Sequence, residues 1–98
     1  ASDVYKRQLE NIPSRTVLEL GTATGVLALS LLEAGLYVDT VDYSWDMQFA
    51  AKNKLIHFAE NIRSRIHFIL SDVTTFRPSK KYGAIMIPDS LLTVIPED

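Results

Sequence analysis

The stretch VLELGTATG at residues 17–25 decides the fold of this 98-residue chain. Its apolar first half is typical of a buried strand, and the small residues that follow predict a tight turn into a helix. Gly21 and Gly25 permit such a turn and let the backbone come close to a ligand. The first N–H groups of the helix would be unpaired and would suit an anion, although an ordinary strand-to-helix turn also uses glycine.

Three further apolar runs resemble the strand in this stretch, and all four are continuous rather than strictly alternating. The runs are Thr16–Leu20, Tyr37–Val41, Ile66–Leu70 and Ala84–Ile87. Continuous apolar strands are expected in parallel sheets, where both faces are covered. Helical patterns separate the first three runs, whereas Val73–Lys81 is too short and too rich in Pro, Ser and Lys to predict a helix. This alternation predicts an α/β fold with right-handed crossovers and a parallel sheet.

Two helices are expected between the strands. Residues 25–34 (GVLALSLLEA) are apolar almost all round, which predicts a deeply buried helix that Gly35 would cap. A second helix is expected from about Trp45 to Ile62, with Ser44 as its N-cap and Asp46 in its first turn. Its apolar stripe consists of Met47, Ala50, Ala51, Leu55, Phe58, Ala59 and Ile62.

Acidic residues stand where the predicted strands end. Glu19, Asp42 and Asp72 each lie at the carboxyl end of a strand or just beyond it. In open parallel sheets the ligand crevice lies at that edge. Asp42 is placed, relative to Gly21, where an acid accepts hydrogen bonds from ribose hydroxyls, although a solvated turn aspartate is the plainer interpretation. Asp39 is expected at the surface, because Asp42 is the residue that ends the run.

Two classes of cofactor fit this layout. The dinucleotide fingerprint requires glycine at its first, third and sixth positions, where this chain has Gly21, Ala23 and Val26. A pyrophosphate would also lie close to the like-charged Glu19. A cationic sulfonium cofactor meets no such repulsion, so these residues favour it over a dinucleotide.

Glu19 followed by G-x-A-x-G at residues 21–25 resembles the first motif of the class I S-adenosylmethionine-dependent methyltransferases, in particular their small-molecule branch. Ala23 replaces the middle glycine of that motif. Residues 41–47 resemble the second motif, whose aspartate holds the ribose diol and whose neighbours pack on adenine. Residues 71–73 are similar to the third, whose aspartate contacts the adenine amino group, and residues 82–92 to the fourth strand and its exit loop. The resemblance implies that the cofactor-binding residues are Glu19, Gly21, Thr22, Ala23, Gly25, Asp42, Tyr43, Met47, Asp72, Val73 and Pro88.

The same resemblance implies a Rossmann-like three-layer sandwich with the parallel sheet in the order 3-2-1-4. Residues 9–98 would form the S-adenosylmethionine-binding half of a domain that is truncated before the family's last three strands. The implied activity is in-line methyl transfer from S-adenosylmethionine to a small-molecule acceptor. The alternatives are an NAD(P)-dependent oxidoreductase and a non-catalytic methyltransferase-like binding module, which Ala23 favours. No catalytic residue is assigned, since Asp89 and Ser90 after the fourth strand suit a helix start equally well.

The composition also bears on nucleic-acid binding, thiol chemistry, metal binding and location. A net charge of −2 and a longest basic run of Lys80-Lys81 give no indication of nucleic-acid binding. Because the chain has no cysteine, disulfides and thiolate chemistry are excluded, and we expect no metal site. His57 and His67 are expected to be packing or surface residues. No apolar run reaches membrane-spanning length and no signal peptide is evident, which leaves a cytoplasmic location by elimination.

Residues 1–8 resemble the in-frame translation of a sequencing-library adapter, with DVYKRQ at residues 3–8 as the matching run. We therefore exclude them from the fold and expect the natural start of the protein to differ. We also expect the fragment alone to be marginally stable and poorly active, since its fourth strand would become an edge that exposes Ile85 and Met86.

Overall fold

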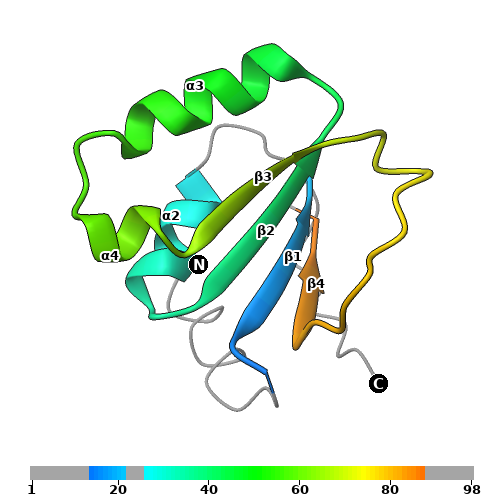
Figure 1. Ribbon diagram of the computed structural model, residues 1–98, viewed down its shortest axis with the longest axis horizontal. Coiled ribbons are helices and arrows are strands. Elements are labelled where there is room, and N and C mark those ends of the chain that lie inside the picture. The colour runs from blue at the N-terminus through cyan, green and yellow to red at the C-terminus, as the bar shows by residue number, and fades with distance from the viewer. Residues whose placement is uncertain (1–13, 22–25, 88–98) are drawn as a thin grey trace.

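The computed structural model describes residues 14–21 and 26–87, which form one parallel sheet with helices beside it (Figure 1). The elements along the chain are β1 (Thr16–Leu20), α2 (Val26–Glu33), β2 (Tyr37–Asp42), α3 (Trp45–Leu55), α4 (Glu60–Arg63), β3 (Ile66–Leu70) and β4 (Ala84–Met86). The strands lie in the order β3-β2-β1-β4, and every neighbouring pair is parallel. The predicted α/β fold and strand order are confirmed, whereas residues 1–8 lie outside the described part of the chain.

The central strand β1 is buried on both faces, and its alternate side chains point into two separate cores. Val17 belongs to the core beneath the helices and Leu18 to the core on the opposite face. The helical-face core consists of Val17, Ala28, Leu31, Leu32, Leu36, Val38, Leu55, Ile66, Ala84 and Met86. The opposite-face core consists of Leu18, Val41 and Tyr82, with Leu20, Ile69, Val73, Phe76 and Ile85 packed against them. Burial on two faces explains why the strand sequences are continuously apolar.

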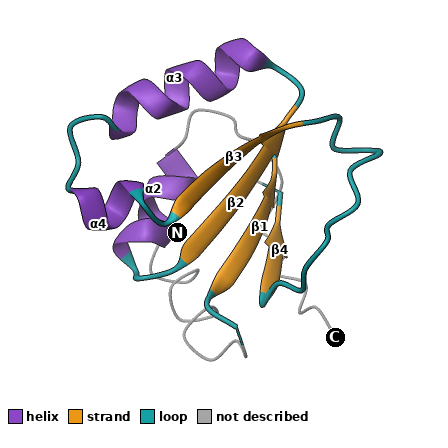
Figure 2. Ribbon diagram, in the orientation of Figure 1, coloured by secondary structure: helices purple, strands orange, loops and turns teal. Residues whose placement is uncertain are grey.

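Helices cover one face of the sheet, and an irregular crossover segment, residues 71–83, covers part of the other (Figure 2). The helices lie behind and to the left of the sheet in this view, while the crossover segment runs from β3 round to β4. The sheet thus lies between a helical layer and a third layer that, over the described residues, contains no helix or strand. The expectation that Val73–Lys81 is not a helix is confirmed. Among the described residues, no helix has the length and apolar character needed to cross a membrane.

The C-terminus of α2 is closed by Gly35, as the sequence predicts. Gly35 has a φ of +89°, its N–H donates to the Leu32 carbonyl at 3.0 Å, and the Leu36 N–H donates to the Leu31 carbonyl at 3.1 Å. This pair of bonds is the Schellman arrangement, which requires a left-handed residue at that position. The Arg15 guanidinium also donates to the Ala34 carbonyl at 3.1 Å, and so ties the helix end to the start of β1.

The expectation of one helix from Trp45 to Ile62 is wrong, because the helix is interrupted. α3 ends at Leu55, and α4 begins at Glu60 after a short turn. Ala59, just before α4, has extended backbone angles (φ −62°, ψ 154°) that no continuous helix allows. The interruption brings Phe58 and Ile62 against the helical-face core, so tertiary packing has overridden the helical periodicity of the sequence.

The inward face of α3 also differs from the predicted stripe. Its buried residues are Gln48, Ala51 and Leu55, whereas Met47 and Ala50 are exposed. Gln48 faces inward because its side-chain amide donates to the Ile69 carbonyl of β3 at 2.6 Å. The predicted N-cap is confirmed: the Ser44 hydroxyl accepts the Met47 N–H at 3.2 Å.

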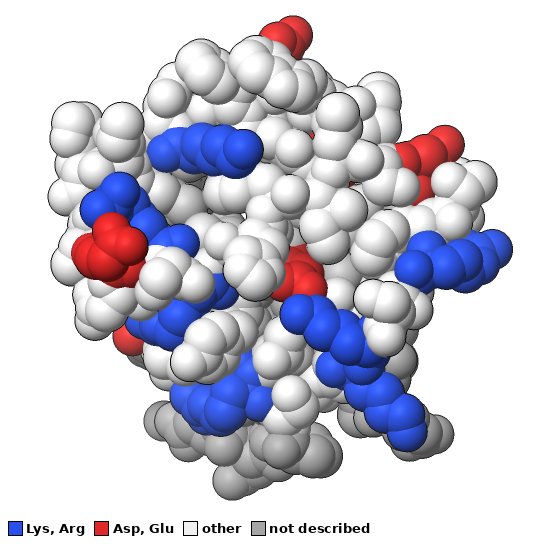
Figure 3. Space-filling view, in the orientation of Figure 1, with Lys and Arg blue, Asp and Glu red and all other residues white. Residues whose placement is uncertain are grey.

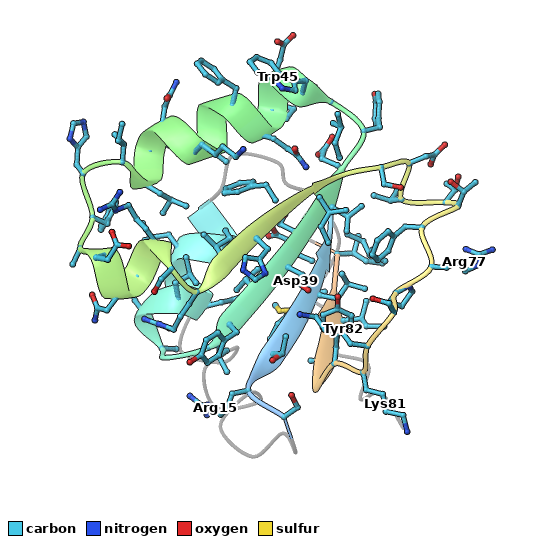
Figure 4. All side chains as sticks on the ribbon, in the orientation of Figure 1. Arg15, Asp39, Trp45, Arg77, Lys81 and Tyr82 are labelled. Atoms are coloured by element: carbon cyan, nitrogen blue, oxygen red, sulfur yellow. The ribbon has the colours of Figure 1, made fainter. Side chains whose placement is uncertain are left out.

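The expectation that Asp39 lies at the surface is wrong, because Asp39 is only 4% exposed. The Tyr82 hydroxyl donates to its Oδ2 at 2.7 Å, the Lys80 ammonium lies 2.9 Å from the same oxygen, and His67 Nδ1 lies 3.4 Å from Oδ1. Figure 4 shows Asp39 and Tyr82 close together on this face, and Figure 3 shows a carboxylate at its centre with basic side chains beside it. The end of the crossover segment thus shields an acid that its strand alone would leave exposed. His67 itself is exposed, as expected.

β4 is an edge of the described sheet, as expected, but it does not expose both predicted residues. Met86 is fully buried because it points into the helical-face core. Ile85 points to the opposite face and is half-buried. The exposed apolar surface at this edge is therefore smaller than the sequence suggests.

Substitution of Gly35 by alanine should destabilise the protein by about 1 kcal/mol, because a Cβ is unfavourable at a left-handed φ. The added Cβ would also lie 3.3 Å from the Arg15 guanidinium, which is flexible enough to move. Urea unfolding of Gly35→Ala measures the loss. Glu33→Ala, an exposed change at the end of the same helix, is the matched control and should stay within about 0.5 kcal/mol of the wild type.

Candidate functional site

The carboxyl ends of β1, β2 and β3 meet at one edge of the sheet. The Gly21 N–H donates to the Val41 carbonyl at 2.7 Å, and the Ser71 N–H donates to the Asp42 carbonyl at 3.0 Å. These bonds continue the parallel ladders just past the strands, so the residues that follow each strand lie side by side. The predicted assembly of Glu19, Asp42 and Asp72 at this edge is therefore what the structure shows.

Gly21 begins the turn after β1 in a conformation that favours glycine. Its φ is +106°, a left-handed value that a side chain makes unfavourable. The sequence prediction of a special turn at this residue is thus confirmed for its backbone. The remaining predicted residues of the turn, Thr22, Ala23 and Gly25, lie outside the described part of the chain, as does Pro88 after β4.

Glu19 is the most unusual group at this edge, because its carboxyl is completely buried. Its Oε1 accepts a short hydrogen bond of 2.6 Å from the Thr40 hydroxyl on β2. Its Oε2 is also buried and has no hydrogen-bond partner among the described residues. Burial raises the pKa of Glu19 from 4.5 to about 7; the Thr40 hydrogen bond opposes that rise, and the nearby Asp42 charge adds to it.

Asp42 is a second nearly buried acid, 8% exposed, at the end of β2. Its Oδ1 accepts the Ser44 N–H at 2.8 Å, which turns the chain from the strand into α3. Ser44 in turn caps α3, so the strand end and the helix start are fixed together. This rigid position suits an acid that accepts hydrogen bonds from a ligand.

Asp72 lies at the same edge but is exposed and shapes its own turn. Its Oδ1 accepts both the Thr74 N–H at 2.8 Å and the Thr74 hydroxyl at 2.7 Å, and these bonds lower the pKa of Asp72. The Thr75 and Phe76 N–H groups donate to the Asp72 carbonyl. Next to it, Val73 is half-buried against the opposite-face core. Contact of either residue with a ligand stays a prediction.

Exposed apolar side chains lie beside Asp42 at the start of α3. Tyr43 is 78% exposed and Met47 37%, and both were predicted to contact a ligand. Trp45, the first residue of α3, stacks on Phe49 with a ring distance of 4.9 Å and points away from the sheet (Figure 4). Large exposed apolar side chains next to a nearly buried acid suit a flat, partly apolar ligand.

Two residues with a structural role at this end of the molecule were not predicted from the sequence. Thr40 holds Glu19, and Gln48 ties α3 to β3. A signal for Gln48 existed, since it is spaced by three and seven residues from Ala51 and Leu55 on the inward stripe. Thr40 carried no comparable signal, because Asp39 and Asp42 of the same strand are polar and buried as well.

Glu19 and Asp42 fit a ligand that carries a cationic group and several hydrogen-bond donors. Glu19 Oε2, which has no partner among the described residues, can accept from an N–H or O–H group, and a positive charge between two acids lowers their mutual repulsion. Among the described residues, no group of three or more His, Asp or Glu side chains could hold a metal ion.

A hollow of about 410 Å³ lies elsewhere, between α3, α4 and β3. Its lining residues are Phe49, Lys52, Asn53, Leu55, Ile56, Arg63, Ile66 and Phe68. It opens near the C-terminus of α3 and the start of β3, away from the carboxyl ends of the strands. None of the predicted site residues lines it.

No protein-family model matches the chain, and no curated protein matches it. Solved methyltransferase structures do match. The glycopeptide N-methyltransferase MtfA complexed with sinefungin superposes with a TM-score of 0.78 at 22% identity, over 88% of this chain and 37% of that one. The CcbJ methyltransferase from Streptomyces caelestis gives a TM-score of 0.71 at 23% identity, over 88% of this chain and 35% of that one.

The methyltransferase domain of bacterial CtHen1 gives a TM-score of 0.72 at 24% identity, over 88% of this chain and 47% of that one. At such identities the likeness shows a common fold, which is the Rossmann-like fold of these methyltransferases. The chain spans about 35–47% of the length of these three matches.

Glu19 should make the folded protein less stable as the pH rises. Between pH 4.5 and about 7, the folded protein keeps a proton on Glu19 that the unfolded chain has lost. Over this range the free energy of unfolding should therefore fall by roughly 3 kcal/mol through this group, as measured by urea unfolding at several pH values.

Glu19→Gln should remove this part of the pH dependence, because glutamine does not ionise. Glu33→Gln, a change at an exposed acid on α2, should leave it in place. An equally steep loss of stability in Glu19→Gln and in the wild type would contradict the assignment to Glu19.

Proposed function

We propose that this chain provides the S-adenosylmethionine site of a methyltransferase that acts on a small-molecule acceptor. The observation that carries the proposal is the pair of buried acids, Glu19 and Asp42, at the carboxyl edge of the sheet. Among the described residues, Glu19 Oε2 has no hydrogen-bond partner there. The fold is also that of the glycopeptide N-methyltransferase MtfA, whose structures contain S-adenosylmethionine, S-adenosylhomocysteine or sinefungin.

Each predicted residue has a proposed role in binding the cofactor. Asp42 accepts hydrogen bonds from the ribose hydroxyls, and Glu19 faces the cationic part of the cofactor. Tyr43 and Met47 cover the adenine ring with their exposed apolar surface, while Asp72 and Val73 lie at its edge. Thr22, Ala23, Gly25 and Pro88 are proposed as further contacts on the sequence pattern alone.

S-adenosylmethionine supplies an activated methyl group on its sulfonium, so the chain need not supply a nucleophile. The contribution of these residues is to fix the cofactor in one orientation, which favours in-line attack. The rigid link from β2 through Asp42 and Ser44 into α3 serves that purpose. The methyl acceptor's site and any general base are not assigned to residues of this chain.

A dinucleotide is the alternative ligand. It would bring a pyrophosphate towards the acidic edge, where Asp42 and ionised Glu19 repel it. Because burial lets Glu19 hold a proton near pH 7, this repulsion is weaker than the sequence alone suggests. A direct comparison of ligands therefore separates the two proposals better than the charge argument does.

Isothermal titration with S-adenosylhomocysteine and with NAD tests the proposal. We expect S-adenosylhomocysteine to bind and NAD not to bind. Asp42→Asn should weaken S-adenosylhomocysteine binding by about tenfold or more, because it replaces charge-assisted hydrogen bonds by neutral ones.

Asp46→Asn, which neutralises an exposed acid in the first turn of α3, is the matched control and should leave the affinity unchanged. Binding of NAD without binding of S-adenosylhomocysteine would overturn the methyltransferase proposal. Binding of S-adenosylhomocysteine without methyl transfer from S-adenosylmethionine would instead favour the non-catalytic binding module.

A further inference from the structure

Thr40 holds the carboxyl of Glu19. The two residues face each other across the β1–β2 ladder, and both are completely buried. The Thr40 hydroxyl donates to Glu19 Oε1 at 2.6 Å, a length typical of a hydrogen bond to an ionised acid. Thr40 therefore fixes which oxygen of Glu19 forms a hydrogen bond within the protein and which oxygen remains for a ligand.

The oxygen left over is Oε2, and it needs a partner in either protonation state. When Glu19 is ionised, buried Oε2 requires a hydrogen-bond donor. When Glu19 is protonated on Oε2, the new O–H requires an acceptor instead. Leaving either requirement unmet costs free energy, so a ligand that brings a donor to Oε2 gains affinity.

The charges around Glu19 among the described residues are of one sign. Asp42, near the end of the paired strand β2, adds a like charge. β4, the strand on the other side, carries only Ala84, Ile85 and Met86, with Met86 opposite Glu19. None of the described salt bridges involves Glu19. A cation that stabilises the ionised form of Glu19 must then come from a ligand, as far as the described residues show.

We propose that Thr40 is a positioning residue that presents Glu19 Oε2 to the cationic part of the cofactor, so that cofactor binding releases a proton from Glu19 to the solvent. This inference rests on the proposed S-adenosylmethionine site. Thr40 acts only through Glu19 and touches no reacting atom. In the step itself, the O–H bond of the Glu19 carboxyl breaks, its proton passes to the buffer, and the ligand's positive charge takes its place beside the carboxylate.

This coupling makes cofactor affinity depend on pH in a defined direction. Below about pH 7 most of the free protein carries the proton on Glu19, so binding must remove it and affinity rises with pH. The rise approaches tenfold per pH unit and levels off above about pH 7, where Glu19 is already ionised. The Thr40 hydrogen bond opposes protonation of Glu19. Loss of that bond should therefore raise the pH at which the cofactor affinity stops increasing.

Isothermal titration with S-adenosylmethionine, whose sulfonium charge S-adenosylhomocysteine lacks, measures both quantities in buffers of different ionisation enthalpy. The wild type should release close to one proton per ligand at about pH 6 and almost none at about pH 8. Thr40→Val should bind more weakly near pH 7 and release its proton over a higher pH range. Thr40→Ser, which keeps the hydroxyl, should restore the wild-type profile, and Glu19→Gln should bind without any proton release.

Thr16→Val, a threonine change at the opposite end of the same sheet, is the control and should match the wild type in affinity and proton release. Wild-type binding without proton release at about pH 6 would overturn this inference alone. So would a Thr40→Val profile that coincides with that of the wild type. Absence of S-adenosylmethionine binding at every pH would overturn the proposed function, and this inference with it.

Discussion

The parallel pairing of β1 with β2 determines the rest of the structure and its site. One register sets Val17 beside Val38 in the helical-face core and Glu19 beside Thr40 on the same face. A slip of one residue would send Glu19 to the opposite face and separate it from Thr40. Apolar packing at the first residues of the two strands therefore holds in place a polar contact at their far end. The stability of the core and the geometry of the site are consequences of the same ladder.

Much of the fold follows from local features of the sequence. Gly21 and Gly35 have positive φ values where the sequence predicts turns, and Ser44 caps α3 as its place predicts. Each of these is decided by a few neighbouring residues, which is why sequence analysis identifies them. The strand order followed from resemblance to a family with known topology, and the strand positions followed from the continuous apolar runs in the sequence.

The features that the sequence did not predict depend on residues far apart in the chain. Asp39 is buried because Tyr82, 43 residues later, donates a hydrogen bond to it. Glu19 was predicted at the site, but its raised pKa depends on burial, and the hydrogen bond from Thr40, 21 residues later, opposes that rise. The break between α3 and α4 follows from the packing of Phe58 against a core assembled by other strands. Local propensity carries no information about such partners.

The contacts of Asp39 have a consequence for how the molecule opens. The crossover segment, residues 71–83, contains no helix or strand, so its order depends on its two ends and on the few side chains that pack against the sheet. Its later end is anchored by the bonds of Tyr82 and Lys80 to Asp39, and its first residues carry Asp72 and Val73. Segments of this kind open as cooperative units. Release of the Asp39 anchor would thus free one wall of the proposed adenine pocket while the β1–β2 ladder remained folded.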